Sequence, residues 1–159
     1  MRENEAIPTA NAVPMETRIA MIREAAAYAN KEYMERCWVL DEKDNKKKWL
    51  WEKYDTPQVI VCAANRYKDF IVTGSRHYSV PMQMTIGLVG LDALYEYCKA
   101  FDDEVEDDKA GRQQGFIDQY GTFHNRKEAM RLCLEQGRPL KEEGGYIGLG
   151  YDLFSEHLY

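Results

Sequence analysis

Several features are scarce in this sequence, and each absence removes a class of protein. None of its apolar runs reaches the roughly 18–20 residues that span a bilayer. Basic residues do not predominate, because 21 Lys and Arg stand against 27 Asp and Glu, for a formal net charge of −6. A protein that coats DNA or RNA needs a basic face, so we expect neither nucleic acid nor a membrane as partner. The first residues lack the basic-then-apolar pattern of a signal peptide, which favours an intracellular protein.

Cysteine and histidine lack the spacing of metal or redox sites. The four cysteines stand far apart at Cys37, Cys62, Cys98 and Cys133, without a Cys-x-x-Cys pair or a nearby histidine. Zinc sites and redox pairs need ligands brought together by local spacing. We therefore expect no metal and no cofactor, and interpret the cysteines as buried, reduced thiols.

What is present suggests an N-terminal extension, residues 1–56, before a compact core. Residues 1–14 have no periodicity and predict a flexible tail. Ile19, Ile22, Ala26 and Tyr33 recur at helical spacing, which predicts an amphipathic helix over 15–37. Two short aromatic stretches then flank a charged tip in residues 38–54, and both a hairpin and a broken helix fit that pattern.

Residues 57–159 show the pattern of an α+β core. Apolar runs at 59–64 and 70–73 predict an antiparallel hairpin, and residues 114–118 predict a short third strand. A helix is expected from Val80 to about Phe101, and another after Asn125, which caps it with Glu128. The expected fold is thus a small antiparallel sheet packed with two or three helices, plus the N-terminal helical extension. The glycine-rich segment 144–150 follows no predicted strand, so we interpret it as a loop.

One group of residues suggests a phosphate-binding pocket. Arg66 flanks the hairpin turn, Arg76 and His77 follow the second strand, and Arg126 opens a helix beside Asn125. Arginine offers forked donors that match phosphate oxygens, and a helix N-terminus favours anions. Phe116 and Phe123 flank the same turn and offer faces for stacking on a base. Taken singly, each of these residues also fits a structural role.

Three segments resemble a known family. VICAANRYKD–IVTGSRH, QGFIDQYGTFHNRKEA and the closing LFSEHLY are similar to segments of the small phage anti-defence proteins of the first Thoeris type. Those proteins are sponges for glycocyclic ADP-ribose, the signal made by bacterial TIR-domain immune sensors. The similarity covers roughly residues 58–138 and the last seven. The first 55 or so residues exceed the compact family core, and His157 stands where an acidic residue is expected.

The resemblance implies sequestration of a cyclic nucleotide without cleavage, and thus a protein that is not an enzyme. It implies a dimer or larger homo-oligomer in the cytoplasm of the infected bacterium, and some of the similar proteins also hold cyclic oligonucleotides at a separate site. By the same resemblance Phe116 stacks on adenine near Asn125, Arg76 and Arg126 bind the diphosphate, and Arg138 is a further candidate.

Two alternatives remain open at this point. A nucleotide-processing enzyme, such as a phosphodiesterase or hydrolase, would use His77 or His124. A phage accessory protein would instead dock a host protein through the amphipathic helix at 15–37.

Overall fold

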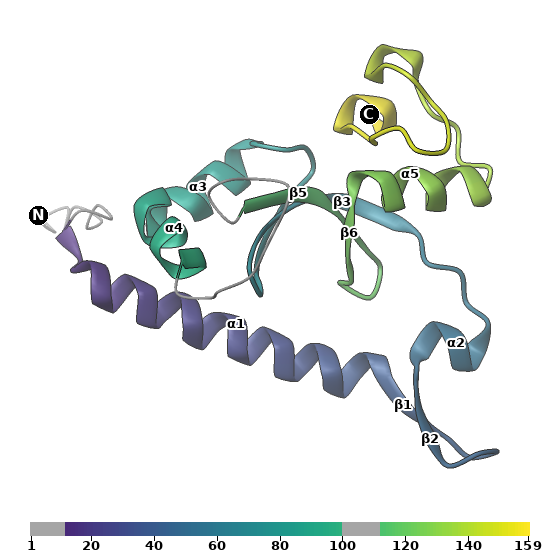
Figure 1. Cartoon of the computed structure of the whole chain (residues 1–159), viewed down its shortest axis with the longest axis horizontal. Coiled ribbons are helices and arrows are strands. Elements are labelled where there is room, and N and C mark those ends of the chain that lie inside the picture. The colour runs from purple at the N-terminus through teal and green to yellow at the C-terminus, as the bar shows by residue number, and fades with distance from the viewer. Residues whose placement is uncertain (1–11, 100–111) are drawn as a thin grey trace, which may run out of the picture.

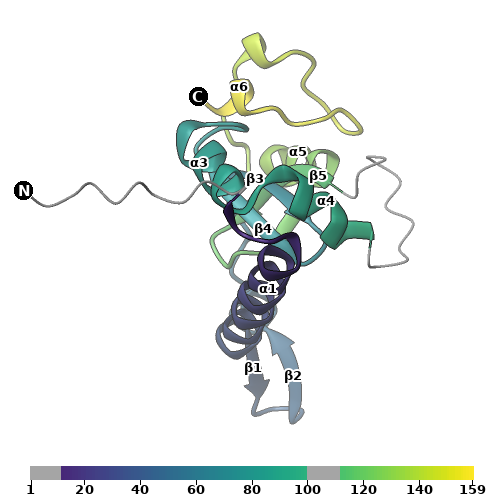
Figure 2. The ribbon, with the colours of Figure 1, turned by 90° about the vertical axis from the view of Figure 1, so that its left-hand side faces the viewer.

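The computed structural model describes residues 12–99 and 112–159 (Figure 1). A four-stranded sheet with helices on one face forms its centre, and a long N-terminal helix lies beside it (Figures 1 and 2). The architecture is α+β, as predicted. The predicted acidic loop at 102–108, and all but the last three residues of the predicted tail, lie outside the described residues.

The sheet is antiparallel throughout, in the order β4-β3-β5-β6. Its strands are β3 (Ile60–Tyr67), β4 (Phe70–Gly74), β5 (Arg112–Asp118) and β6 (Phe123–Asn125). The predicted hairpin and third strand are confirmed. Strand β6 was not predicted. It forms because the Asp118 carboxylate accepts hydrogen bonds from the backbone N–H groups of Tyr120 and Thr122, which closes the turn between β5 and β6.

Register divides the residues of this sheet between two faces. Phe116 pairs with Ala63 and Gln114 with Asn65, so these four share one face. Arg66 pairs with Gln113 and Ile117 with Phe123, so these lie on the opposite face. A bulge between Ile60 and Cys62 sets this alternation, because the extra residue reverses the direction of every side chain beyond it.

Helices cover the Phe116 face and form two hydrophobic clusters with it. In the first, Tyr67 and Val72 of the sheet pack against α3 (Val80–Val89) and α4 (Leu91–Lys99). In the second, Ala63 and Phe116 pack against α5 (Arg126–Glu135), with Leu153 closing the cluster.

One predicted helix is in fact two. The expected helix from Val80 to about Phe101 ends at Val89, and α4 starts at Leu91. Between them Gly90 adopts φ 91° and ψ 130°, outside the helical region. The two glycines of this stretch therefore differ, because Gly87 is helical and only Gly90 turns the chain. Phe101 lies outside the described residues.

Helix α5 begins and ends as its sequence predicts. The Asn125 side chain accepts from the Glu128 N–H at 2.8 Å, and the Glu128 carboxylate accepts from the Asn125 N–H at 3.0 Å. This capping box satisfies two backbone donors at the start of the helix. At its other end Gly137 takes φ 63°, which lets the chain turn away.

The N-terminal helix α1 (Met15–Cys37) has the predicted bounds and packs on the core. Ile22 belongs to the first cluster, and the buried Arg18 guanidinium pairs with both carboxylate oxygens of Asp92 on α4. Beyond α1, strands β1 (Trp38–Asp41) and β2 (Lys46–Trp49) pair as a hairpin, which is one of the two structures predicted for this region. Helix α2 (Leu50–Tyr54) follows them. The rings of Trp38 and Trp49 pack at 4.0 Å where this hairpin closes.

The C-terminal segment folds over α5 (Figure 1). It contains a short 3₁₀ helix η2 (Glu142–Gly144) and the helix α6 (Ser155–Leu158), which the sequence analysis did not predict. His157 is fully buried against Gly144, where a β-carbon would lie 2.3 Å from the imidazole ring. Among the described residues, no helix combines the length and apolarity needed to cross a bilayer.

Candidate ligand-binding groove

The predicted site residues divide between the two faces of the sheet. Arg66 donates to the Gln113 side chain on the face toward α1. Arg126 donates to the Gln114 side chain, and adjacent residues of a strand point to opposite faces. The single cationic pocket expected from the sequence is therefore not formed within one chain.

The residues on the Phe116 face hold the C-terminal segment. The Arg126 guanidinium lies 4.5 Å from the ring centre of Phe154, and Arg76 donates to the backbone oxygen of Tyr159 at 3.2 Å. His77 accepts from the Ser155 hydroxyl at Nδ1 (3.0 Å) and donates from Nε2 to the Gly115 carbonyl (2.8 Å). Through these contacts, Arg126, Arg76 and His77 stabilise the position of the C-terminal segment on the sheet.

His77 makes these two hydrogen bonds as a neutral imidazole. Burial lowers its pKa, and the nearby positive charge of Arg126 lowers it further. Ser155 is 2% exposed, so its hydroxyl does not reach a substrate in solvent. The pair joins α6 to the sheet.

Three other predicted site residues also make contacts within the chain. Phe116 is fully buried in the second cluster, and its contact with adenine stays a prediction of the resemblance. Asn125 caps α5, and Arg138 donates to the Ile60 carbonyl at 2.5 Å. A buried aromatic ring and a capping amide are the structural alternatives for these residue types.

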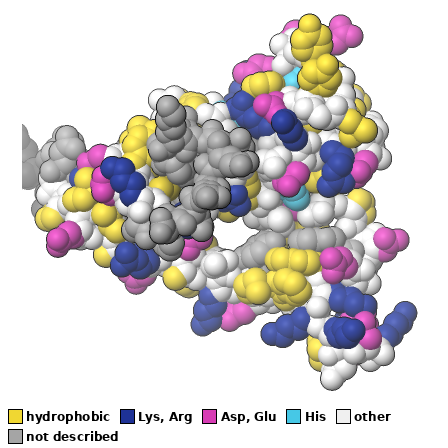
Figure 3. All heavy atoms as spheres, viewed as in Figure 1, with side chains coloured by type: hydrophobic (Ala, Val, Ile, Leu, Met, Phe, Trp, Pro, Cys, Tyr) yellow, Lys and Arg dark blue, Asp and Glu magenta, His cyan; other side chains and the backbone are white. Residues whose placement is uncertain are grey.

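The opposite face of the sheet carries a hollow. It lies between α1 and the sheet and has a volume of about 740 Å³. We call it the helix–sheet groove. Figure 3 shows an opening in the surface between α1 and the rest of the molecule. Its walls are formed by the following residues: Ala25, Ala26, Ala29, Asn30, Glu32, Arg36, Cys37, Arg66, Lys68, Asp69, Phe70, Ile71, Thr73, Ile117, Tyr120, Gly121, Thr122 and Phe123.

Arg66 and Phe123 meet in this groove. The guanidinium carbon of Arg66 lies 4.6 Å from the centre of the Phe123 ring, which is a cation–π contact. The Phe123 ring in turn lies over Gly115, where a β-carbon would approach it to 2.6 Å. Glycine at 115 therefore lets the ring lie close to the sheet, in a position that supports Arg66.

The Arg66 charge is only weakly compensated. Its hydrogen-bond partner, Gln113, is neutral, and within residues 12–99 and 112–159 no carboxylate forms an ion pair with it. Burial lowers the pKa of Arg66, and the more distant Glu128 opposes that shift. The guanidinium stays charged, so an anion that entered the groove would offset its desolvation.

The rest of the groove is mixed in character. Its lining includes three basic residues and two acidic ones, although the whole chain carries a net −6. Arg36 already pairs with Glu32 at 3.2 Å. Apolar walls with a few convergent polar groups are typical of small-molecule sites, and volumes of about 300–1,000 Å³ are usual for them.

Sequence reasoning found Arg66 and Phe123 but missed the contribution of α1. Ala25, Ala26 and Ala29 line the groove, and their small side chains leave room between helix and sheet. The only signal in the sequence was the run of alanines at 25–27, which also suits any helix. At its end, the Cys37 thiol donates to the Tyr120 carbonyl at 3.3 Å, which fixes α1 to the β5–β6 turn.

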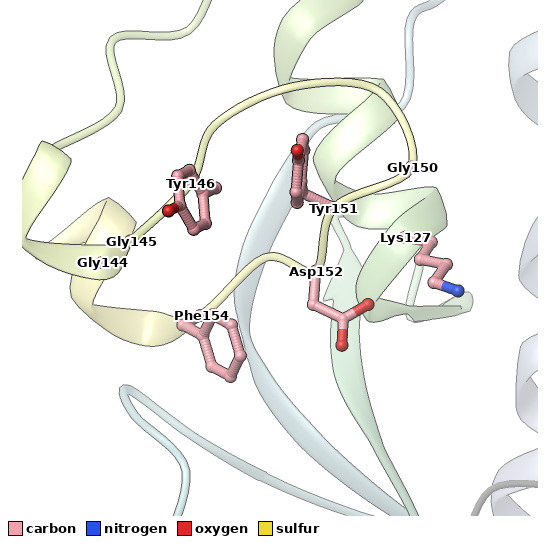
Figure 4. A pocket seen from close by; sticks show the side chains of 8 residues that line it. All are labelled: Lys127, Gly144, Gly145, Tyr146, Gly150, Tyr151, Asp152 and Phe154. Atoms are coloured by element: carbon pink, nitrogen blue, oxygen red, sulfur yellow. The ribbon is translucent and has the colours of Figure 1, made fainter.

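A second hollow lies in the C-terminal segment (Figure 4). This C-terminal pocket has a volume of about 390 Å³, and its lining includes Lys127, Tyr146, Tyr151, Asp152 and Phe154. The two tyrosine rings stack at 5.5 Å, and Tyr146 is 80% exposed. The pocket is smaller than the helix–sheet groove and includes a carboxylate that would repel phosphate.

A buried pair, Asp118 and His124, completes the β5–β6 turn. Burial disfavours the charge of Asp118, but hydrogen bonds from His124, Thr122, Gln58 and Tyr120 outweigh it and lower its pKa. His124 Nε2 lies 2.9 Å from the carboxylate. Across the described residues, no three His, Cys, Asp or Glu side chains are grouped in a way that could hold a metal ion.

A family model described as "Phage T4 y16D protein" matches residues 59–159, which include the whole four-stranded sheet and the C-terminal segment. The chain belongs to this phage family. The matched region includes Arg66 and Phe123 but not α1, so the y16D family match covers only one wall of the groove. No curated protein and no solved structure matches the chain.

Proposed function

We propose that this y16D-family protein binds a nucleotide of the ADP-ribose class in the helix–sheet groove and holds it unchanged. The observation that supports the proposal is the half-buried Arg66 guanidinium, which is stacked on Phe123 and has no carboxylate partner among the described residues. A diphosphate supplies the missing negative charge, and forked guanidinium donors match its oxygens.

The rings and alkyl groups of the groove suit the remainder of such a ligand. Ile117, Phe70 and Tyr120 line the groove beside the arginine and offer apolar contact to a base and its ribose. The resemblance to the Thoeris anti-defence proteins supplies the ligand class. Capture of glycocyclic ADP-ribose would block TIR-dependent defence in the infected host.

Capture without reaction requires tight binding and no group that stabilises a transition state. Nanomolar affinity corresponds to about −12 kcal/mol, which a ligand of this size reaches when it is largely enclosed. The groove provides enclosure from two sides, with α1 opposite the sheet.

The test is calorimetric titration of the full chain with glycocyclic ADP-ribose and with ADP-ribose. We expect Arg66→Gln to weaken binding by about 1.5–3 kcal/mol, the value of a charged hydrogen bond. The matched control is Arg76→Gln, because Arg76 is an exposed arginine at the C-terminal segment, outside the groove lining, and should change little.

A second measurement separates capture from catalysis. After heat denaturation of the complex, chromatography should recover the ligand intact and in stoichiometric amount. A wild-type protein that binds neither probe, an affinity unchanged by Arg66→Gln, or a chemically altered ligand would each contradict the proposal.

A further inference from the structure

The C-terminal pocket differs in composition from the helix–sheet groove. Three aromatic rings line it, those of Tyr146, Tyr151 and Phe154, together with the carboxylate of Asp152 and the ammonium group of Lys127. In Figure 4 the two tyrosine rings lie above Phe154 and Asp152, on the other side of the hollow. Its volume of about 390 Å³ suits a single small ligand.

The tyrosine rings of this pocket are large, apolar and exposed. Tyr146 is 80% exposed and Tyr151 is 51% exposed, and their rings stack with centres 5.5 Å apart. Neither ring belongs to one of the two hydrophobic clusters, so the core does not account for them. Exposed apolar groups that are gathered beside polar ones are typical of interaction and ligand-binding surfaces.

Contacts within the chain fix the walls of the pocket before a ligand arrives. The Phe154 N–H donates to His157 Nδ1 at 2.9 Å, and the Tyr151 N–H donates to the Gly148 carbonyl at 3.2 Å. The Arg126 guanidinium lies over the Phe154 ring, 4.5 Å from its centre. Because these walls are already ordered, binding there loses less conformational entropy.

Lys127 and Asp152 bring opposite charges to the pocket without pairing. Within residues 12–99 and 112–159, neither side chain forms a hydrogen bond or an ion pair. The carboxylate of Asp152 repels an anion, whereas Lys127 and the neighbouring Arg126 repel a cation. The charges therefore favour a ligand that has no net charge but offers both donors and acceptors.

Hydroxyl groups match both charged side chains. A carboxylate only accepts hydrogen bonds and an ammonium group only donates them, whereas a hydroxyl does both. A sugar ring carries hydroxyls around its rim and C–H groups across its face. Its hydroxyls can bond to Asp152 and Lys127, while its C–H groups pack on the electron-rich faces of the tyrosine rings.

We infer that the C-terminal pocket binds an uncharged sugar of mono- or disaccharide size. Tyr146 and Tyr151 contact the C–H face of the sugar, and Asp152 and Lys127 hydrogen-bond to its hydroxyls. Because the two rings are exposed, much of a bound sugar stays in contact with water. We therefore expect a dissociation constant in the millimolar range.

The test is saturation-transfer difference NMR of the full chain with glucose, galactose, N-acetylglucosamine and maltose. At least one of these sugars should receive saturation at its ring C–H protons. We expect a dissociation constant about tenfold larger in Tyr146→Ala and in Asp152→Ala, because each change removes one kind of contact. Tyr146→Phe keeps the ring and should keep most of the affinity.

The matched control is Tyr28→Ala, because Tyr28 is 66% exposed but lies on α1, outside the lining of the pocket. This variant should bind the sugar as the wild type does. Circular dichroism of each variant shows whether the fold is kept, and Tyr146→Ala removes an exposed ring that the core does not use.

Competition with charged probes tests the ligand class. Choline, inorganic phosphate and the zwitterion glycine should each fail to displace the sugar. No transfer to any of the four sugars at about 100 mM, a transfer that Tyr146→Ala leaves unchanged, or displacement by one of the charged probes would overturn the inference. The pocket and the helix–sheet groove share no lining residue, so failure here leaves the nucleotide proposal standing, and the converse also holds.

Discussion

Arg66 and Arg126 show how far residue type can predict a site. Both are arginines next to an aromatic ring, and both donate to a glutamine of β5. One lines the helix–sheet groove, and the other holds the C-terminal segment. The difference arises from the neighbouring positions of Gln113 and Gln114 and from the bulge in β3, neither of which has a clear signature in a single sequence.

At the residue scale we predict that His77 makes stability depend on pH. Its folded-state pKa is lowered by burial and by Arg126, so only the neutral form suits the native contacts with Ser155 and Gly115. The stabilisation is complete above the unfolded pKa of about 6.5, and it is lost as the pH falls from there through the lower folded pKa.

Thermal unfolding between pH 7.5 and 5 measures this dependence. We expect His77→Gln to have a lower Tm than the wild type at pH 7.5 and a flatter pH profile below it. The control is Arg76→Gln, which leaves the imidazole and should keep the wild-type slope. Identical profiles in wild type and His77→Gln would show that another group carries the dependence.

At the scale of elements, sequence patterns predicted bounds well where capping residues mark them. Helix α1 and the start of α5 follow Pro14 and the Asn125–Glu128 capping box. The sequence pattern did not predict the break at Gly90, because a helix can tolerate a glycine within an apolar helical pattern. Here Gly90 instead separates the end of α3 from the start of α4. Strand β6 and helix α6 are only three and four residues long, too short for any periodicity to show.

Gly90 yields the prediction at this scale. A β-carbon at φ 91° is strained, so Gly90→Ala should lower the free energy of unfolding by about 1–3 kcal/mol. Gly87→Ala, in the helical part of the same stretch, should instead raise it by up to about 1 kcal/mol. Urea unfolding of each variant measures both effects. Equal effects of the two substitutions would contradict the assignment of the break to Gly90.

At the scale of the whole molecule, α1 takes part both in the core and in the groove. Ile22 packs in the first cluster, while Ala25, Ala26 and Ala29 line the groove. The sequence predicted the helix but could not predict its position, because an amphipathic pattern shows that one face is buried and not what buries it. The contacts of Arg18 with Asp92 and of Cys37 with Tyr120 show that α1 spans the sheet.

Removing the N-terminal region tests that double role. We expect a fragment of residues 57–159 to have a lower Tm and to bind a dye for exposed apolar surface, because Tyr67 and Val72 lose the cover of Ile22. Calorimetric titration should show that it no longer binds glycocyclic ADP-ribose. Binding as tight as that of the full chain would place the ligand outside the helix–sheet groove.

The neighbouring glutamines of β5 also bear on how the strand finds its place. A slip of β5 by one residue would turn Phe116 out of the core and leave at least one of the two arginines without its glutamine partner. A folding intermediate with misaligned β5 gains little stability, so the strand has one favourable alignment. Misaligned chains should therefore be short-lived during folding, and the two surfaces that β5 separates should form together or not at all.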